Sequence, residues 1–237
     1  MADFNRGYAT TPAVATDRAV VDAGLRAHMI RVFNYMAAGV ALTGVVAWLT
    51  SQIVGPALLN SPLMWVFILA PLALVFFISF RINSLSAGAA LALFFVYAAS
   101  VGLSLATIFF IYTDTSITRV FFVTAAAFGG LSLWGYTTRR SLSGMGSFLI
   151  MGLIGVIIAS VVNIFLKSSG LDWIVSVIGV IVFAGLTAWD TQKIKEMYDP
   201  MDDGTIAGRK AVMGALSLYL DFINLFMLLL RLLGNRR

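Results

Sequence analysis

Residues 87–112 read AGAALALFFVYAASVGLSLATIFFIY and contain no charged side chain. A helix needs roughly 20 consecutive apolar residues to cross about 30 Å of hydrocarbon, and this run is longer than that. It shows no strict alternation of polar and apolar residues, which a strand of a membrane barrel would require. We therefore predict that residues 87–112 cross a membrane as a helix.

The composition of the whole chain points the same way. Of its 237 residues, 60% are hydrophobic and only 11% are charged, whereas a soluble domain carries about 25% charged residues. This small number of charges cannot cover a water-exposed surface. The outer surface must therefore face a lipid bilayer. The chain has no cysteine and one histidine, His28, which excludes thiolate metal sites and sites that need two imidazoles. No basic stripe with interleaved aromatic residues is present, so we expect no nucleic-acid partner.

Six further apolar runs of similar length give an all-α integral membrane protein, a bundle of seven transmembrane helices. We divide the chain into a polar N-terminal tail, residues 1–27, and a seven-helix domain, residues 28–237. The tail is expected to be partly disordered, and a helix that begins near Asp17 would be either an interfacial helix or the lead-in to the first span. The predicted spans are residues 33–54, 63–80, 87–112, 117–137, 145–166, 173–192 and 211–233.

The distribution of Lys and Arg predicts the orientation. Cytoplasmic loops of membrane proteins are enriched in these residues. Of the sixteen Lys and Arg residues, eleven fall on one side of the predicted spans and five on the other. The five include Arg231, Arg236 and Arg237, and those three would suit a re-entrant last segment instead of a full span. We expect a multi-pass protein of the cell (inner) membrane with a cytoplasmic N-terminus and an external C-terminus. The cytoplasmic set is Arg6, Arg18, Arg26, Arg31, Arg81, Arg139, Arg140, Lys193, Lys195, Arg209 and Lys210.

Two carboxylates stand apart from the others. Asp190 lies near the inner end of the sixth span and Asp221 ten residues into the seventh. A charge at bilayer depth costs about 2.5–3.5 kcal/mol even on permissive scales, so such residues usually face the bundle interior. Asn224, one helical turn after Asp221, could add a polar contact. Arg81, at the inner end of the second span, is the candidate cationic partner.

These residues allow two interpretations. They could form a buried ion pair or hydrogen-bond network that only fixes the register of the helices. Alternatively, two facing carboxylates could titrate as a coupled pair that shares one proton, which would make a proton-biased gate. The sequence does not give the sign of such a gate.

No enzyme is expected. Residues 211–233 contain no lysine for a retinal protein, and His28, placed before the first span, cannot serve an intramembrane serine protease. The serines of residues 141–147 do not form a G-x-S-x-G elbow. We expect packing and capping roles for them.

Two motifs carry a family resemblance. The segments LTAWDTQKI, residues 186–194, and SLYLDFINLF, residues 217–226, are similar to signatures of the transmembrane Bax inhibitor motif family. Residues 141–155 resemble its bacterial, YccA-like branch. The resemblance covers roughly residues 28–233 and does not extend to the N-terminal tail.

The resemblance implies a fold in which the last helix is central, and a pH-sensitive calcium leak across the membrane. It assigns Asp190 and Asp221 to a paired proton sensor and Arg81 to a latch on the first of them. We expect no resident cofactor. Calcium would be the transported ion, held weakly by the two aspartates, because this ion prefers six to eight oxygen ligands.

The resemblance also links bacterial members to a membrane-bound ATP-dependent protease. The alternative to a leak channel gated by paired aspartates is therefore a non-conducting membrane regulator that binds and modulates such a protease. Taking both interpretations together, the expected partners of the protein are the lipid bilayer, calcium ions, protons and this protease.

Overall fold

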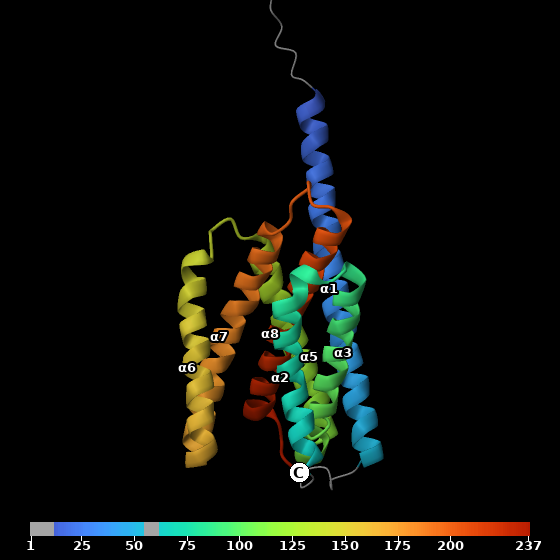
Figure 1. The fold of residues 1–237 in the computed structure, drawn as a ribbon. Helices are drawn as coiled ribbons and strands as arrows, with labels where there is room; N and C mark the ends of the chain where they lie inside the picture. The colour runs from blue at the N-terminus through green and yellow to red at the C-terminus, as the bar shows by residue number, and fades with distance from the viewer. Residues whose placement is uncertain (1–11, 55–61) are drawn as a thin grey trace, which may run out of the picture.

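Seven long helices form one bundle in the computed structural model, which describes residues 12–54 and 62–237 (Figure 1). All seven are long and apolar enough to cross a membrane, which confirms the predicted all-α, seven-span architecture. Successive long helices run up and down the bundle, as short linkers require. The elements are α1 (Pro12–Val54), α2 (Leu63–Arg81), the 3₁₀ turn η2 (Ile82–Ser84), α3 (Ala87–Leu105), α4 (Ile108–Ile111), α5 (Asp114–Thr137), α6 (Ser143–Leu166), α7 (Ser169–Glu196) and α8 (Gly204–Leu233).

The third span is not one helix as predicted. Helix α3 ends at Leu105, and a turn at residues 106–107 separates it from the short α4. The Thr107 hydroxyl donates to the Ser104 carbonyl at 3.1 Å, and the Ser104 hydroxyl donates to the Phe67 carbonyl of α2. Hydroxyl bonds of this kind compete with the regular helical ladder, and an apolar run gives no sign of them.

The first helix is longer than its predicted span. Helix α1 is continuous from Pro12 to Val54 and extends beyond the end of the bundle (Figure 1). The segment from Asp17 is thus continuous with the first span. Of the predicted tail, residues 1–11 lie outside the described residues.

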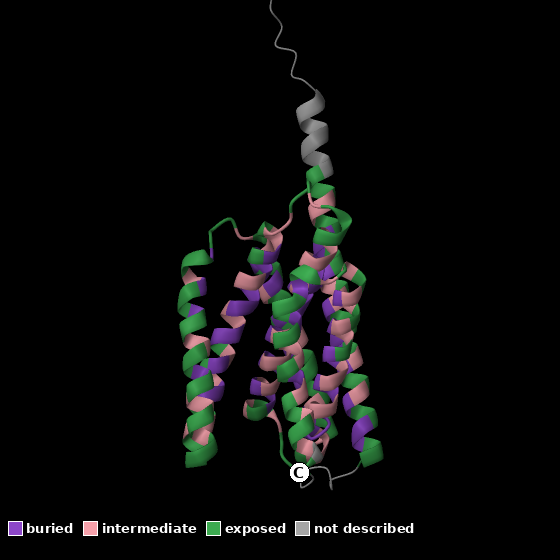
Figure 2. Ribbon diagram, in the orientation of Figure 1, coloured by how far each residue is buried: buried purple, intermediate pink, exposed green. Residues whose placement is uncertain are grey.

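Helix α8 contacts four of the other spans. It packs against α1, α3, α5 and α7, whereas α2 packs chiefly on α3, and α6 on α7. In its most apolar window 61% of residues are buried, compared with 11% for α6, and Figure 2 shows this contrast. Four of the six other spans therefore contact α8 extensively, while α2 and α6 lie further out.

The last segment is a full-length helix. The 30 residues of α8 extend about 45 Å at 1.5 Å per residue, which exceeds the hydrocarbon thickness. The described helix has no break, so it does not have the form of a re-entrant segment. The C-terminus consequently lies at the opposite end of the bundle from the N-terminal part of α1 (Figure 1). We call these the C-terminal end and the N-terminal end.

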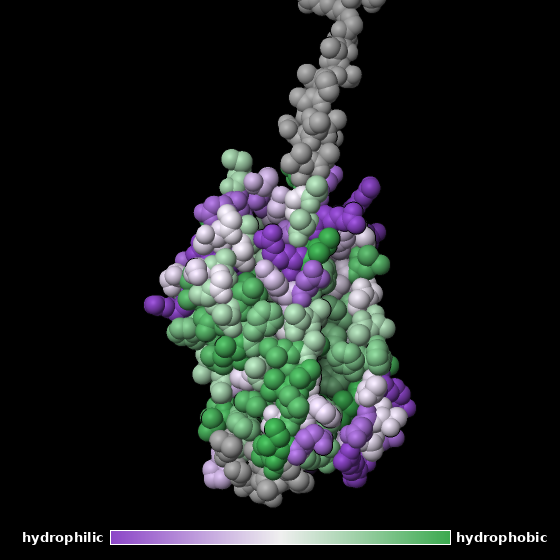
Figure 3. All heavy atoms as spheres, turned by 90° about the vertical axis from the view of Figure 1, so that its right-hand side faces the viewer, coloured by the Kyte–Doolittle hydropathy of each residue, from purple (hydrophilic) through white to green (hydrophobic). Residues whose placement is uncertain are grey.

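The outer surface suits a bilayer. Large apolar side chains on the outer helices are exposed, among them Ile53 (82%), Phe80 (82%) and Phe165 (81%). Figure 3 shows an apolar band across the middle of the molecule between two more hydrophilic ends. Exposure on this scale would drive aggregation in water and is satisfied by lipid.

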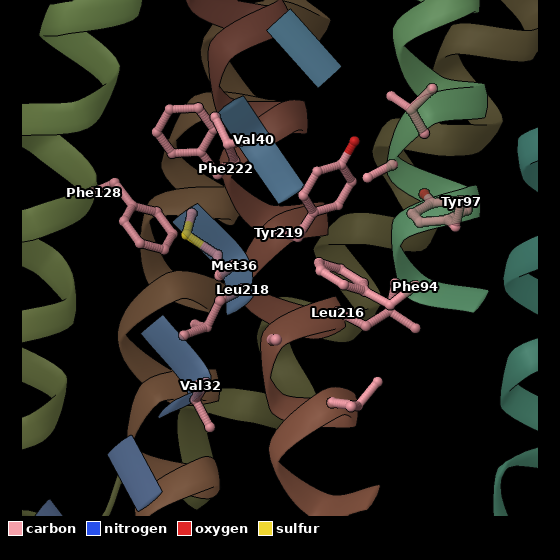
Figure 4. Packing of buried hydrophobic residues seen from close by; sticks show 14 of the residues in the cluster. Val32, Met36, Val40, Phe94, Tyr97, Phe128, Leu216, Leu218, Tyr219 and Phe222 are labelled. Atoms are coloured by element: carbon pink, nitrogen blue, oxygen red, sulfur yellow. The ribbon is translucent and has the colours of Figure 1, made fainter. Parts of the chain in front are cut away.

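A hydrogen bond and an aromatic cluster join α8 to α1 and α3. The hydroxyls of Tyr219 and Thr43 lie 2.6 Å apart, and Thr43 donates to the Ala98 carbonyl at 2.8 Å. The Tyr219 ring makes edge contacts with Phe94 and Tyr97 of α3 (Figure 4). Tyr219 is fully buried, so these contacts fix which side of α8 faces α1 and α3.

The close approach of α5 to α7 gives a stability prediction. A Cβ atom added at Gly135 would overlap the backbone of Ala188, two residues before Asp190. We expect Gly135→Ala to destabilise the protein by about 1–3 kcal/mol, the usual cost of overpacking. Thermal unfolding in detergent would measure this loss. Gly130→Ala is the matched control on the same helix, because a Cβ atom there meets nothing within 4 Å. Equal stability of the two variants would contradict the assigned contact.

Candidate functional site

Helices α7 and α8 bring Asp190 and Asp221 into one cavity. The cavity has a volume of about 640 Å³ and lies between α6, α7 and α8. Most of its lining is apolar, and both carboxylates belong to it. The polar residues that line it are Ser160, Asp190, Lys193, Ser217, Asp221, Asn224 and Arg231.

The two carboxylates differ in their surroundings. Asp221 is 4% exposed, and its Oδ2 atom has no hydrogen-bond partner among the described residues. Asp190 is half-buried at the wall of the cavity. A carboxylate without a partner in an apolar bundle is expensive to keep charged. Asp221 is therefore suited to take up a proton or to attract a cation that enters the cavity.

The spacing of polar residues on α8 explains how they meet the cavity. Ser217, Asp221, Asn224 and Arg231 follow one another at three-, four- or seven-residue steps, so they share one face of a helix. Tyr219, which faces α1 and α3, is two residues from Asp221, or about 200° around the helix. A single orientation of α8 about its own axis therefore places Tyr219 in the buried aromatic cluster and Asp221 in the acidic cavity.

Asn224 lines the cavity but does not bond to Asp221. Its Nδ2 atom donates to the Leu220 carbonyl of its own helix at 2.8 Å. The predicted placement on the same face as Asp221 is thus what the structure shows, while the supporting contact is with the backbone. The side-chain oxygen of Asn224 remains a further possible ligand for a cation in the cavity.

The structure does not bring Arg81 to the carboxylates. Arg81 ends α2 and is exposed, and α2 packs chiefly on α3. Among the described residues Arg81 makes no ion pair with Asp190, so the latch stays a prediction. The cation that lines the same cavity as Asp190 near the N-terminal end is Lys193, one turn further along α7. Its Nζ atom lies 5.1 Å from the centre of the Trp189 ring.

The other end of the cavity carries a second charged residue. Arg231 of α8 lies 3.6 Å from Asp172 of α7, measured from Nη1 to Oδ1. Here the cavity adjoins a smaller polar one of about 400 Å³, with Ser160, Ile164 and Arg231 common to both linings. The acidic cavity is therefore flanked by Lys193 toward the N-terminal end and by Arg231 toward the C-terminal end.

Sequence reasoning misses both of these cations. The signal for Lys193 is its i, i+3 spacing from Asp190 on a helix. Arg231 lies on the same face of α8 as Asp221. Its place among the last Arg residues of the chain, however, favours its interpretation as a charge that flanks the membrane span. No cluster of three or more His, Cys, Asp or Glu residues occurs within the described part of the chain. The cavity thus offers two carboxylates, which suits a weakly held, passing cation.

The fold and the cavity together define a polytopic helical membrane protein with an acidic pair in its interior. Comparison with known proteins agrees. The family profile described as "Inhibitor of apoptosis-promoting Bax1" matches residues 25–237, and the chain belongs to this Bax inhibitor family. The predicted family resemblance is therefore confirmed.

Bacterial relatives match over nearly their whole length. The chain is 49% identical to inner membrane protein YbhL of Escherichia coli over 220 residues, which is 91% of this chain and 94% of that protein. It is 45% identical to an uncharacterized protein of Rickettsia prowazekii over 239 residues, and 44% identical to one of Caulobacter vibrioides over 252 residues. Both of these alignments cover all of each chain. The seven helices and the E. coli relative together indicate a multi-pass inner-membrane protein.

The unpartnered Asp221 carboxylate gives a second prediction. Asp221→Asn keeps the shape of the side chain but removes its charge. We expect it to raise the free energy of unfolding at mildly alkaline pH by about 1–3 kcal/mol, because a neutral amide costs less to bury in an apolar bundle than a charged carboxylate. Thermal unfolding in detergent would measure the gain. Asp114→Asn is the control, because Asp114 pairs with Arg237 at the surface; its effect should be small. A destabilised Asp221→Asn protein would show that the carboxylate has a partner after all.

Proposed function

We propose that this protein is a pH-sensitive leak channel for cations, with calcium as the favoured ion, in which Asp190 and Asp221 form a proton sensor. The observation that carries the proposal is the common cavity of the two carboxylates between α6, α7 and α8. Few charged side chains lie at this depth, and a pure packing role does not require a cavity of this volume around them. Family membership supports a channel-like or regulatory role in the membrane.

The proton acts through the pairing of the two carboxylates. When both are charged they repel each other in surroundings that screen the charge poorly. One shared proton removes most of this repulsion and replaces it with a hydrogen bond between the side chains. Because Asp190 is on α7 and Asp221 is on α8, the change alters how strongly these helices hold together.

Calcium enters this proposal as the transported ion and not as a resident cofactor. Two carboxylates supply fewer oxygens than the six to eight that calcium prefers, so water and the Asn224 side-chain oxygen would complete the shell. A weak site of this kind favours passage, since conduction requires an ion to leave as readily as it binds. The flanking Lys193 and Arg231 would oppose passage and keep a basal leak small.

The proposed orientation places the N-terminal end in the cytoplasm. The structure supplies a reason why the arginines at the C-terminal end do not contradict it. Arg231 and Arg237 pair with Asp172 and Asp114, at 3.6 Å and 2.8 Å, so these two carry little unbalanced positive charge. The excess of Lys and Arg at the N-terminal end then supports a cytoplasmic N-terminus.

Calcium flux in liposomes tests the leak and its sensor. Purified protein should release calcium at a rate that depends on pH, and Asp221→Asn should give the same rate at mildly acidic and mildly alkaline pH, because the pair can no longer exchange its proton. Asp114→Asn, outside the cavity, should behave as the wild-type protein. If Asp221→Asn leaves both the leak and its pH response unchanged, the sensor is disproved. If the wild-type protein shows no flux, the channel itself is disproved.

The second candidate function is a regulator of a membrane-bound ATP-dependent protease. The observation that favours it is the extension of α1 beyond the bundle (Figure 1). A projecting helix offers a contact surface that a simple channel does not need.

Deletion of residues 1–20 distinguishes the two functions. The regulator function predicts loss of co-purification with the protease while calcium flux is retained, because the deletion removes no residue that lines the cavity. Asp221→Asn should retain co-purification with the protease and lose only the pH response of the flux. Retained binding of the protease after the deletion would exclude this segment as the contact surface.

A further inference from the structure

A second groove runs between α1 and α5, away from the acidic cavity. It consists of two chambers of about 590 and 610 Å³. Both chambers are lined by Val40, Phe121 and Phe222, which mark a waist between them. Helices α1 and α5 each pack on α8 but are not packed closely on each other. The groove shares no lining residue with the acidic cavity, so a role for the groove is independent of the proposed leak.

Small residues are present on both of the facing helices, among larger apolar and aromatic side chains. Ala37, Ala41 and Gly44 line it on α1, and Ala125 and Gly129 line it on α5. In lipid, small residues usually let two helices approach closely. Here the two helices stand apart instead, and added Cβ atoms at Gly44 and Gly129 would meet nothing within 4 Å. The small residues therefore leave room for something that is not part of the described chain.

One buried polar side chain points to a ligand in the chamber nearer the N-terminal end. Ser132 lines this chamber and is 4% exposed, and its hydroxyl has no hydrogen-bond partner among the described residues. Other buried hydroxyls in the spans bond to the carbonyl four residues earlier, as Thr124 does to Val120 at 2.8 Å and Thr187 to Phe183 at 2.8 Å. A hydroxyl in an apolar site is costly without an acceptor. No described residue supplies an acceptor to Ser132, and the residue lines this chamber, so a ligand there could supply one.

The polarity of the groove matches an amphiphile from each leaflet. Asn34 and Tyr136 line the N-terminal chamber, and the ion pair of Asp114 and Arg237 lines the C-terminal one. The lining between these polar groups is largely apolar. From Asn34 to Gln52, helix α1 rises about 27 Å, close to the thickness of the hydrocarbon layer. An acyl chain that enters the groove from either leaflet thus follows an apolar path. The polar part of the lipid then lies near the polar residues of the protein at the start of that path.

We propose that the groove is a phospholipid-binding site, with an acyl chain in each chamber. In the N-terminal chamber the Ser132 hydroxyl donates to an ester carbonyl of the lipid. In the C-terminal chamber the lipid phosphate accepts from the N–H groups of Arg237 that are not bonded to Asp114. A partner transmembrane helix suits the groove less well, because a straight rod cannot follow the waist at Phe121 and Phe222, whereas two flexible chains can end there.

Photolabelling in nanodiscs tests this site. The probe is phosphatidylethanolamine with a diazirine on one acyl chain, added in trace amount to nanodiscs of phosphatidylethanolamine and phosphatidylglycerol. Peptide mass spectrometry should locate the label on the α1 and α5 residues that line the groove. Gly129→Leu should abolish labelling in the N-terminal chamber and spare the other, and Gly44→Leu should do the reverse. Gly130→Leu is the matched control, because Gly130 does not line the groove and has equally open surroundings.

A milder variant keeps the test decisive if a leucine impairs folding. Ser132→Ala should reduce labelling of the N-terminal chamber roughly two- to tenfold, which is what one net hydrogen bond is worth. Ser176→Ala, where the hydroxyl is already bonded to the Asp172 carbonyl at 2.7 Å, should have no effect. Equal labelling of the Gly129→Leu and Gly130→Leu proteins would overturn the proposal. So would a second protein chain, instead of lipid, cross-linked in the groove.

Discussion

The contact of Tyr219 with Thr43, Phe94 and Tyr97 fixes the rotation of α8, and the rest of the bundle depends on it. In lipid there is no water to satisfy a misplaced polar group, so a helix that carries both a tyrosine and an aspartate has few acceptable rotations. With the tyrosine against α1 and α3, Asp221 must face the side of α7 and α6. The hydrogen bond of 2.6 Å between the two hydroxyls thereby also determines where the acidic cavity lies.

The outer helices are held differently from the central ones. Helices α2 and α6 each pack mainly on one neighbour, so fewer contacts resist their movement than resist movement of α8. Helix α6 forms one wall of the acidic cavity, and α2 carries Arg81. The elements best able to move are therefore those that cover the acidic pair or could deliver a cation to it. This division suits a protein whose interior must open and close.

Two open spaces with different chemistry lie on the surface of one small bundle. The cavity between α6, α7 and α8 contains carboxylates and flanking cations, whereas the groove between α1 and α5 is mostly apolar with polar ends. The two proposed roles, in ion passage and in lipid binding, would thus occupy separate parts of the bundle. Each space has one buried polar atom without a partner among the described residues, Asp221 Oδ2 and Ser132 Oγ.

The sequence by itself determined the seven spans, because a bilayer demands apolar runs of a set length, and it singled out Asp190 and Asp221, because charge in such runs is costly. It did not determine the break after Leu105, the distance of Arg81 from the pair, or the roles of Lys193 and Arg231. Those depend on side-chain bonds and on which helices pack together, which hydropathy does not encode. Only the tertiary structure could show that α1 and α5 stand apart, since small residues equally permit two helices to touch.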